Sequence, residues 1–373
     1  MGSIRLVLAL AVIAAHTGPF FGFPLIGGPQ AVQLFFIISG FYMTLILNEK
    51  YTGPGSYALF ASNRALRLFP LYWTVLVATV VISVIAGFIS GHWLWLSPWV
   101  DNWSFLSGGT FALLGIANVF IFGQDLVMFL GANAAGHLEF THDFRSAEPQ
   151  LWTLLQVPAA WSLALELTFY ALAPFIVRRR LPIILAIIGA CLAFRVVMHL
   201  KFGLSADPWS SRFFPFELGV FLLGTVSWHI LKHIEAVGAP SRAVLLTILV
   251  GYMLLVTAFA ALPYNNGLPF FAKKWVLFGL TAVAIPYIFT LTKSWRFDAA
   301  IGELSYPIYI VHGLIISVCA GTIASLGIKH HEGLIVSVIA IVVSLLMIRV
   351  ISDPIESFRR ARVARAKAAK PAV

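Results

Sequence analysis

The sequence predicts an all-α, polytopic integral membrane protein, and three properties of the 373-residue chain support this fold class. Apolar and aromatic residues make up 60% of the chain, charged residues only 11%, and the mean hydropathy is +0.91. Soluble domains carry about 25% charged residues, so a water-soluble protein is excluded. A membrane crossing takes about 20 mostly apolar residues, so about ten crossings fit this length and leave only short loops.

The apolar stretches and the basic residues together predict a topology. Short cytoplasmic segments collect Lys and Arg. Arg5 precedes the first stretch and a basic cluster follows Asp353, so both termini are expected in the cytoplasm. This requires an even number of crossings, and we expect ten, with the short segment 108–123 re-entrant or interfacial. Residues 1–358 would form the transmembrane domain and residues 359–373 a basic cytoplasmic tail. The eleven apolar stretches are 4–20, 31–47, 68–90, 108–123, 161–177, 182–200, 213–231, 243–262, 275–292, 304–326 and 333–351.

Charge and cysteine content exclude several function classes. The net charge of +10 follows from the cytoplasmic basic segments and gives no reason to expect nucleic acid. Cys191 and Cys319 lie in apolar stretches and form no disulfide or metal motif. The first stretch also has the apolar core and the small residues, Ala14 and Ala15, of a cleavable signal peptide, but a single basic residue precedes it and cleavage would fall beside His16.

Ionisable residues inside the predicted helices are candidate functional residues, because burying them in hydrocarbon is costly. Arg5 and His16 are 11 residues apart, almost three helical turns, so they share a face about 16 Å apart along the axis. The alternative is a water-capped histidine at a helix end with a snorkelling arginine. Arg64 and Arg67 are neighbours on one helical face at the cytoplasmic boundary, a pattern suited to a phosphate-rich ligand. Positive-inside bias or anionic lipid headgroups would explain the pair equally well.

A second group of polar residues lies in the middle of the chain. Ser162, Glu166 and Tyr170 are spaced by four and line one helical face. A carboxylate in such a helix needs a partner, and His16 is an available one. The alternative is a structural carboxylate bonded to hydroxyl groups.

Two weaker patterns complete the set. Ser39 lies in the run FFIISGFY, where small residues favour close helix packing. Near the end of the chain, Ser305, Tyr309 and His312 fall roughly on one face, and the pattern alone leaves their function open.

The wording and order of these motifs resemble the acyltransferase 3 family of integral-membrane, acyl-CoA-dependent O-acyltransferases. The resemblance rests on an arginine and then a histidine in the first helix, followed by FFIISGFY, NRALRLFPLYW, WSLALELTFYALAP and GELSYPIYIVH, and it extends from Ile4 to about Phe358. It implies transfer of acyl groups, often acetyl, from coenzyme A to envelope glycans or related acceptors. The chain looks like a member that consists of the membrane domain without an appended hydrolase-like domain.

The resemblance also implies roles for individual residues. The family's Glu-x-Pro near the last helix is replaced here by Asp353-Pro354-Ile355-Glu356. By likeness to the family, the catalytic histidine would be His16, the arginine of the same helix Arg5, the pair near the coenzyme A phosphates Arg64 and Arg67, the WSL-x-x-E carboxylate Glu166, and the late Y-x-x-H histidine His312.

These residues predict a mechanism with two versions. Acyl-CoA, most often acetyl-CoA, would be a co-substrate gripped at the inner surface, with no permanently bound cofactor and no metal. His16 would act as general base on the acceptor hydroxyl, or form an acyl-histidine, with Glu166 orienting the imidazole. The expected partners are acyl-CoA, a glycan, lipid-linked sugar or small-molecule acceptor, and membrane lipids of the bacterial cytoplasmic membrane.

A different function class stays open at this point. A proton-coupled transporter also needs buried His, Glu and Arg, although the internally repeated halves of such proteins are not evident here. The outer segments carry enough polar groups to bind a sugar, but most are expected to be hydrated loop residues. They are Asp101, Asp125, His137, Glu139, His142, Asp143, Arg145 and Glu148.

Overall fold

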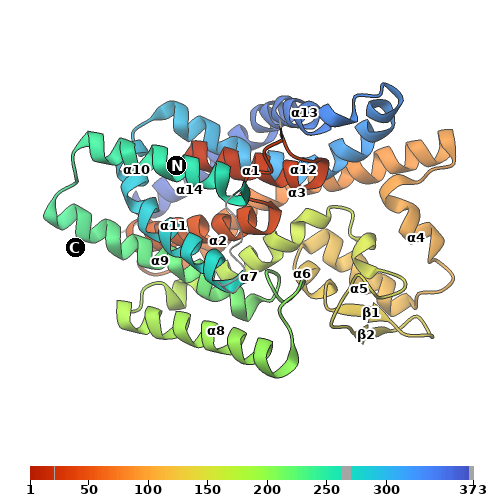
Figure 1. Ribbon diagram of the computed structural model, residues 1–373, viewed down its shortest axis with the longest axis horizontal. Helices are drawn as coiled ribbons and strands as arrows, with labels where there is room; N and C mark the ends of the chain where they lie inside the picture. The colour runs from red at the N-terminus through yellow and green to blue at the C-terminus, as the bar shows by residue number, and fades with distance from the viewer. Residues whose placement is uncertain (21, 262–269, 369–373) are drawn as a thin grey trace.

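The computed structural model describes residues 1–20, 22–261 and 270–368, and it confirms the all-α polytopic fold (Figure 1). Within these ranges, nine helices are long and apolar enough to cross a membrane. They are α2 (Gly28–Glu49), α3 (Ser56–Ser90), α7 (Trp161–Ile176) with the 3-10 turn before it (Pro158–Ala160), α8 (Leu181–Phe202), α9 (Phe214–Val237), α10 (Arg242–Ala258) with the 3-10 turn after it (Phe259–Ala261), α11 (Phe270–Thr292), α12 (Arg296–Ser325) and a last helix made of α13 (Glu332–Met347), a π-helical turn (Ile348–Ser352) and α14 (Asp353–Ala368).

Two shorter apolar helices correspond to the tenth predicted crossing and to the segment that was predicted not to cross. The expected tenth crossing corresponds to α1 (Gly2–Thr17), which has 16 residues. The segment expected to be re-entrant or interfacial contains α5 (Gly108–Phe120). Its 13 residues extend about 20 Å, less than the hydrocarbon thickness of about 30 Å, so α5 alone is too short to cross.

Two expected boundaries differ from the structure. The apolar stretch 68–90 is only part of a longer helix, since α3 begins at Ser56 and so contains Arg64 and Arg67, which face a cavity inside the protein. The basic segment after residue 358 is helical as far as Ala368. Arg362 of this segment donates hydrogen bonds to Ser62 and Asn63 of α3, so α14 packs against the bundle there.

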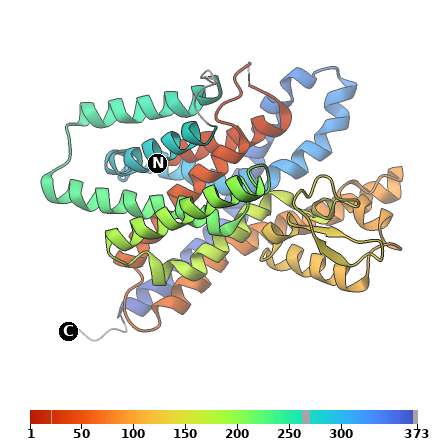
Figure 2. The same cartoon turned by 60° about the horizontal axis from the view of Figure 1, so that its bottom comes forward.

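The two ends of the bundle differ in chemistry. We call the end where α1, α3 and α12 begin the basic end, and the opposite end the loop end. The N-terminus and α14 lie toward the left of Figures 1 and 2, at the basic end, and the long connection between α3 and α7 lies on the right. That connection contains α4 (Ser97–Asp101), α5, α6 (Gln124–Val127) and the antiparallel strands β1 (Leu130–Ala132) and β2 (Leu138–Phe140).

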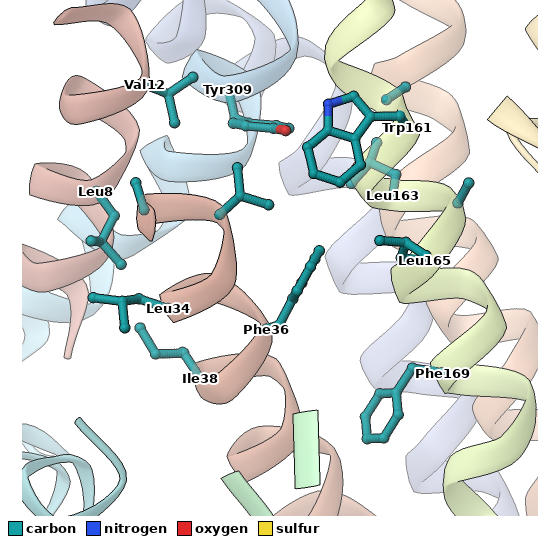
Figure 3. Close-up of a cluster of buried hydrophobic side chains, with 14 of the residues drawn as sticks. Leu8, Val12, Leu34, Phe36, Ile38, Trp161, Leu163, Leu165, Phe169 and Tyr309 are labelled. Atoms are coloured by element: carbon teal, nitrogen blue, oxygen red, sulfur yellow. The ribbon is translucent and has the colours of Figure 1, made fainter. Parts of the chain in front are cut away.

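Helix α1 occupies the centre of the bundle, where it packs against α2, α12 and α13. Its apolar residues, such as Leu8 and Val12, are buried (Figure 3). Gly2 makes the approach to α12 possible, because a Cβ atom there would lie 1.6 Å from the carbonyl oxygen of Asp298. This central position fixes which residues of α1 face the interior.

The outer faces of the bundle are apolar and exposed. Phe88 is 80% exposed, Leu200 73% and Val350 72%. Surfaces of this kind are unusual in a water-soluble monomer but expected where side chains contact lipid.

The loop end is tied to α3 by buried polar groups. The Tyr72 hydroxyl donates to the carbonyl of Asn118 and accepts a hydrogen bond from Gln124, at 2.9 Å. Next to Gln124, burial raises the pKa of Asp125 to about 6. Asp125 is the exception among the outer polar residues named above, since the other seven are exposed as expected of hydrated loops.

Candidate functional site

A cavity of about 470 Å³ opens into the bundle from the basic end, and its size falls in the range of ligand-binding pockets. Six basic residues line it against four acidic ones, so its net charge is positive. The basic residues are Arg5, Lys50, Arg64, Arg67, Lys293 and Arg359, and the acidic residues are Glu166, Asp298, Glu303 and Glu356.

The predicted Arg64–Arg67 pair does face this cavity, together with Arg5. Arg64 is only 9% exposed, and its Nε has no hydrogen-bond partner among the described residues. Arg67 forms an ion pair with Glu303 at 3.1 Å, and its charge acts on Arg5. Three guanidinium groups from two helices therefore converge on one space, an arrangement that suits an anionic ligand.

The residues spaced by four on α7 also meet in the cavity. Ser162, Glu166 and Tyr170 all line it, as the helical spacing predicts. The Glu166 carboxylate accepts a hydrogen bond from Ser39 at 2.6 Å and another from Tyr170. Ser39 is therefore part of the site, whereas its neighbour Gly40 provides the helix packing expected of this motif.

The predicted partnership between Glu166 and His16 is wrong. Both residues are described, and neither a hydrogen bond nor an ion pair joins them. Glu166 lies in the cavity with Ser39 and Tyr170, while His16 does not line the cavity. Two ionisable residues in different helices need not meet, because each can find hydroxyl or aromatic partners nearer by.

His16 is instead paired with His312, the histidine at the late motif position. The ring centres are 5.3 Å apart and the ring planes are inclined by 34°. His16, in the last turn of α1, is exposed at the loop end, whereas His312 of α12 is 3% exposed. The Nδ1 atom of His312 lies 2.6 Å from the carbonyl oxygen of Tyr309.

Tyr309 stands between the cavity and the two histidines. Its side chain lines the cavity, and its ring centre is 5.9 Å from that of His312. The hydroxyl is held by Ser162 at 2.7 Å and donates to the carbonyl of Ala159 at 3.0 Å. In Figure 3 the ring extends from α12 toward Trp161 of α7. Ser305, one turn earlier on α12, lines the cavity and donates to the Gly302 carbonyl.

Several residues of the site were not predicted from the sequence. Arg359 had been assigned to the tail, but it is 7% exposed, lines the cavity and pairs with Glu356 at 2.5 Å. The Glu356–Arg359 spacing on one helical face was the available signal. Arg212, from the α8–α9 connection, stacks 4.1 Å from the Trp161 ring centre, and its charge acts on His16. No sequence pattern links Arg212 to α1.

The fold and the site together define an integral membrane protein with a basic internal cavity and a histidine pair beyond it. Residues 2–349 match the family model Acyl_transf_3, described as an acyltransferase domain. The chain therefore belongs to the acyltransferase 3 family, as its motifs predicted, and is a membrane acyltransferase. No curated protein and no solved structure matches it.

Proposed function

We propose that this protein transfers an acyl group, most often acetyl, from acyl-CoA bound at the basic end to a hydroxyl group of an acceptor at the loop end. The acceptor is an envelope glycan or a related molecule, and the protein resides in the bacterial cytoplasmic membrane. The observation that carries the proposal is a cationic cavity that ends one side chain, Tyr309, away from the histidine pair. The family assignment favours this reaction over proton-coupled transport.

The binding of the donor in this proposal rests on buried guanidinium nitrogens that have no hydrogen-bond partner among the residues that the structure describes. The Nε atoms of Arg64 and Arg359 are buried without a hydrogen-bond partner in the described part of the chain. Leaving charged donors unpaired in a buried site is costly, and the phosphate groups of coenzyme A would supply the missing acceptors. Arg5 and His16 lie about 16 Å apart along α1, so the pantetheine arm must span about this distance between the arginines and the histidine.

In the acyl-transfer step, His16 acts as the general base. A neutral His16 takes the proton of the acceptor hydroxyl as its oxygen attacks the thioester carbon. The C–S bond then breaks, and the proton passes to the departing thiolate, which leaves as coenzyme A thiol. In the alternative route, the imidazole of His16 attacks the thioester carbon first and forms an acyl-histidine, and the acceptor hydroxyl then takes the acyl group from it. Glu166, bonded to Ser39 and Tyr170, shapes the donor cavity in this scheme and does not orient His16.

The donor assignment can be tested at the arginine pair. In Arg64→Gln/Arg67→Gln, the dissociation constant for acetyl-CoA should rise at least about tenfold, since each charged hydrogen bond is worth about 1.5–3 kcal/mol. Binding is measured on purified protein by calorimetry. Arg180→Gln, an exposed residue outside the cavity, serves as the matched control. Unchanged affinity in the double variant would eliminate the phosphate site.

The transfer assignment can be tested at His16. His16→Ala should abolish acyl transfer while expression and membrane insertion stay as in the wild type, because the ring lies at the exposed end of α1. Mass spectrometry of envelope glycan esters, with and without the protein, identifies the acceptor. A His16→Ala protein that restores those esters in a deletion strain would remove the imidazole from the reaction.

A further inference from the structure

His312 has one ring nitrogen whose protonation the structure fixes. Its Nδ1 lies 2.6 Å from the carbonyl oxygen of Tyr309, and a carbonyl oxygen can only accept a hydrogen bond. Nδ1 therefore carries a hydrogen. In the neutral ring, which burial to 3% exposure favours, Nε2 then has a lone pair and needs a donor.

The ring of His16 is the group placed to supply that donor. Two imidazoles joined by a hydrogen bond of about 3 Å between ring nitrogens have their centres about 5 Å apart. The observed separation is 5.3 Å, with the planes inclined by 34°. His16 is also the one charged or titratable group whose charge acts on His312 in the described part of the chain. Catalytic hydrogen bonds are often misaligned without substrate and tighten when it binds.

We propose that His312 is a positioning residue that fixes the tautomer of His16. The chain of contacts runs from the Tyr309 carbonyl to His312 Nδ1, and from His312 Nε2 to an N–H of His16. The second nitrogen of His16 then presents its lone pair to the acceptor hydroxyl at the exposed loop end. This inference rests on the proposed function, and it gives His312 the orienting task that the sequence had assigned to Glu166.

The arrangement also gives the proton a defined path. When His16 takes the acceptor proton, it becomes an imidazolium whose other N–H still points to His312 Nε2. The hydrogen bond to that lone pair is stronger when the donor is charged, so His312 stabilises the state that forms during attack. The proton leaves from His16 to the thiolate, and His312 ends the cycle unchanged. Arg212 is the charged group in the described part of the chain whose charge acts on His16.

Two substitutions of His312 separate an orienting role from a structural one. The Oε1 atom of His312→Gln can replace Nε2 as an acceptor, whereas His312→Leu has no polar group. We expect kcat for thiol release from acetyl-CoA in membrane vesicles to fall about 10²–10⁴-fold in His312→Leu and to stay within about tenfold in His312→Gln. The KM for acetyl-CoA should stay within about twofold in both, because His312 does not line the cavity.

A second measurement does not depend on acyl transfer. Diethyl pyrocarbonate reacts with the lone pair of neutral imidazole, so its rate at His16, followed by peptide mass spectrometry between pH 5 and 8, reports the tautomer and basicity of that ring. The rate at His16 should fall several-fold in His312→Leu and recover in His312→Gln. Exposed His137 is the internal control within each protein.

The outcomes are distinct. His229→Gln and His229→Leu, at a half-buried histidine of α9, are the matched controls for folding and should behave as wild type. Equal losses in both His312 variants, or wild-type kcat and His16 reactivity in His312→Leu, would overturn the orienting role. If the wild type released no more thiol than His16→Ala, the proposed function would fail, while the reactivity of His16 would still decide the role of His312.

Discussion

Arg64 is buried in the wall of the cavity with a nitrogen that an anionic ligand could bind. The guanidinium has lost most of its hydration, its Nε has no partner among the described residues, and its carbon lies 6.0 Å from the centre of the Phe60 ring. Burying such a donor unsatisfied costs on the order of 1–3 kcal/mol. A protein keeps an arrangement of this cost where an anion offsets it.

Tyr309 lies between the cavity and the histidines. In Tyr309→Phe the ring stays but loses its hydrogen bonds to Ser162 and the Ala159 carbonyl. We expect acceptor-independent hydrolysis of acetyl-CoA to rise several-fold, because a less constrained ring admits water to the thioester. The assay is thiol release without acceptor. Tyr252→Phe, a buried tyrosine that bonds Thr281 between α10 and α11, is the control, and equal hydrolysis in all three proteins would contradict the sealing role.

Sequence predicted the site well within single helices and poorly between them. The faces formed by Arg64 and Arg67, and by Ser162, Glu166 and Tyr170, follow from local helical geometry, which spacing alone determines. Partners across helices depend on packing that no spacing encodes. Glu166 was thus given the wrong partner, and Arg212 and Arg359 were not assigned to the site.

At the scale of elements, the α2–α9 contact explains the glycine in FFIISGFY. A Cβ atom on Gly40 would lie 1.8 Å from the carbonyl oxygen of Phe221, and one on Gly224 would lie 2.1 Å from that of Ile37. The two helices can approach this closely only because both positions lack a side chain. Since Ser39 precedes Gly40, the same contact helps to hold its hydroxyl against Glu166.

This contact gives a stability prediction. Gly40→Ala should lower stability by about 1–3 kcal/mol, because the added methyl group overlaps backbone and forces the helices apart. Thermal unfolding in detergent measures the effect. In Gly189→Ala the new Cβ meets nothing within 4 Å, so that variant should be as stable as the wild type or slightly more so. Equal melting of both variants would argue against the close packing.

Buried charge fixes another element, the connection between α8 and α9. The carbonyl oxygen of Ser210 accepts hydrogen bonds from Arg195 and Lys274, both at 3.0 Å, and from Gln33 at 3.3 Å. Arg195 is also paired with Glu217 at 2.7 Å. Four helices thus hold the short connection that carries Arg212 to Trp161. Arg195 lies within the apolar stretch 182–200, and no spacing in the sequence identifies partners from so many elements.

At the scale of the whole molecule, the helix positions were largely predictable. Each crossing needs a long apolar run, and composition reveals such runs directly. The exceptions, the early start of α3 and the helical segment after residue 358, occur where charged residues line an internal cavity. There a charge no longer marks the edge of the membrane.

The orientation in the membrane can be checked by chemical labelling. In a protein with Cys191→Ser and Cys319→Ser, we place single cysteines by Arg180→Cys at the basic end and Glu139→Cys at the loop end, both at exposed positions. A membrane-impermeant maleimide should label Glu139→Cys in intact cells and Arg180→Cys only in inverted vesicles, because basic loops stay in the cytoplasm. The reverse pattern would place acyl-CoA on the wrong side of the proposed reaction.

The π-helical turn at Ile348–Ser352 changes the rotation of the part of the last helix that follows it. It borders a second cavity of about 320 Å³, which shares Arg67, Glu303 and Arg359 with the first. A π turn inserts one extra residue, and each added residue rotates the rest of the helix by about 100°. A chain shortened by one residue there could continue as regular α-helix, but Glu356 and Arg359 would then be turned by about 100° from their present direction into the cavity. One extra residue in the last helix thus determines whether Arg359 faces the cavity that Arg64 and Arg67 of α3 also line.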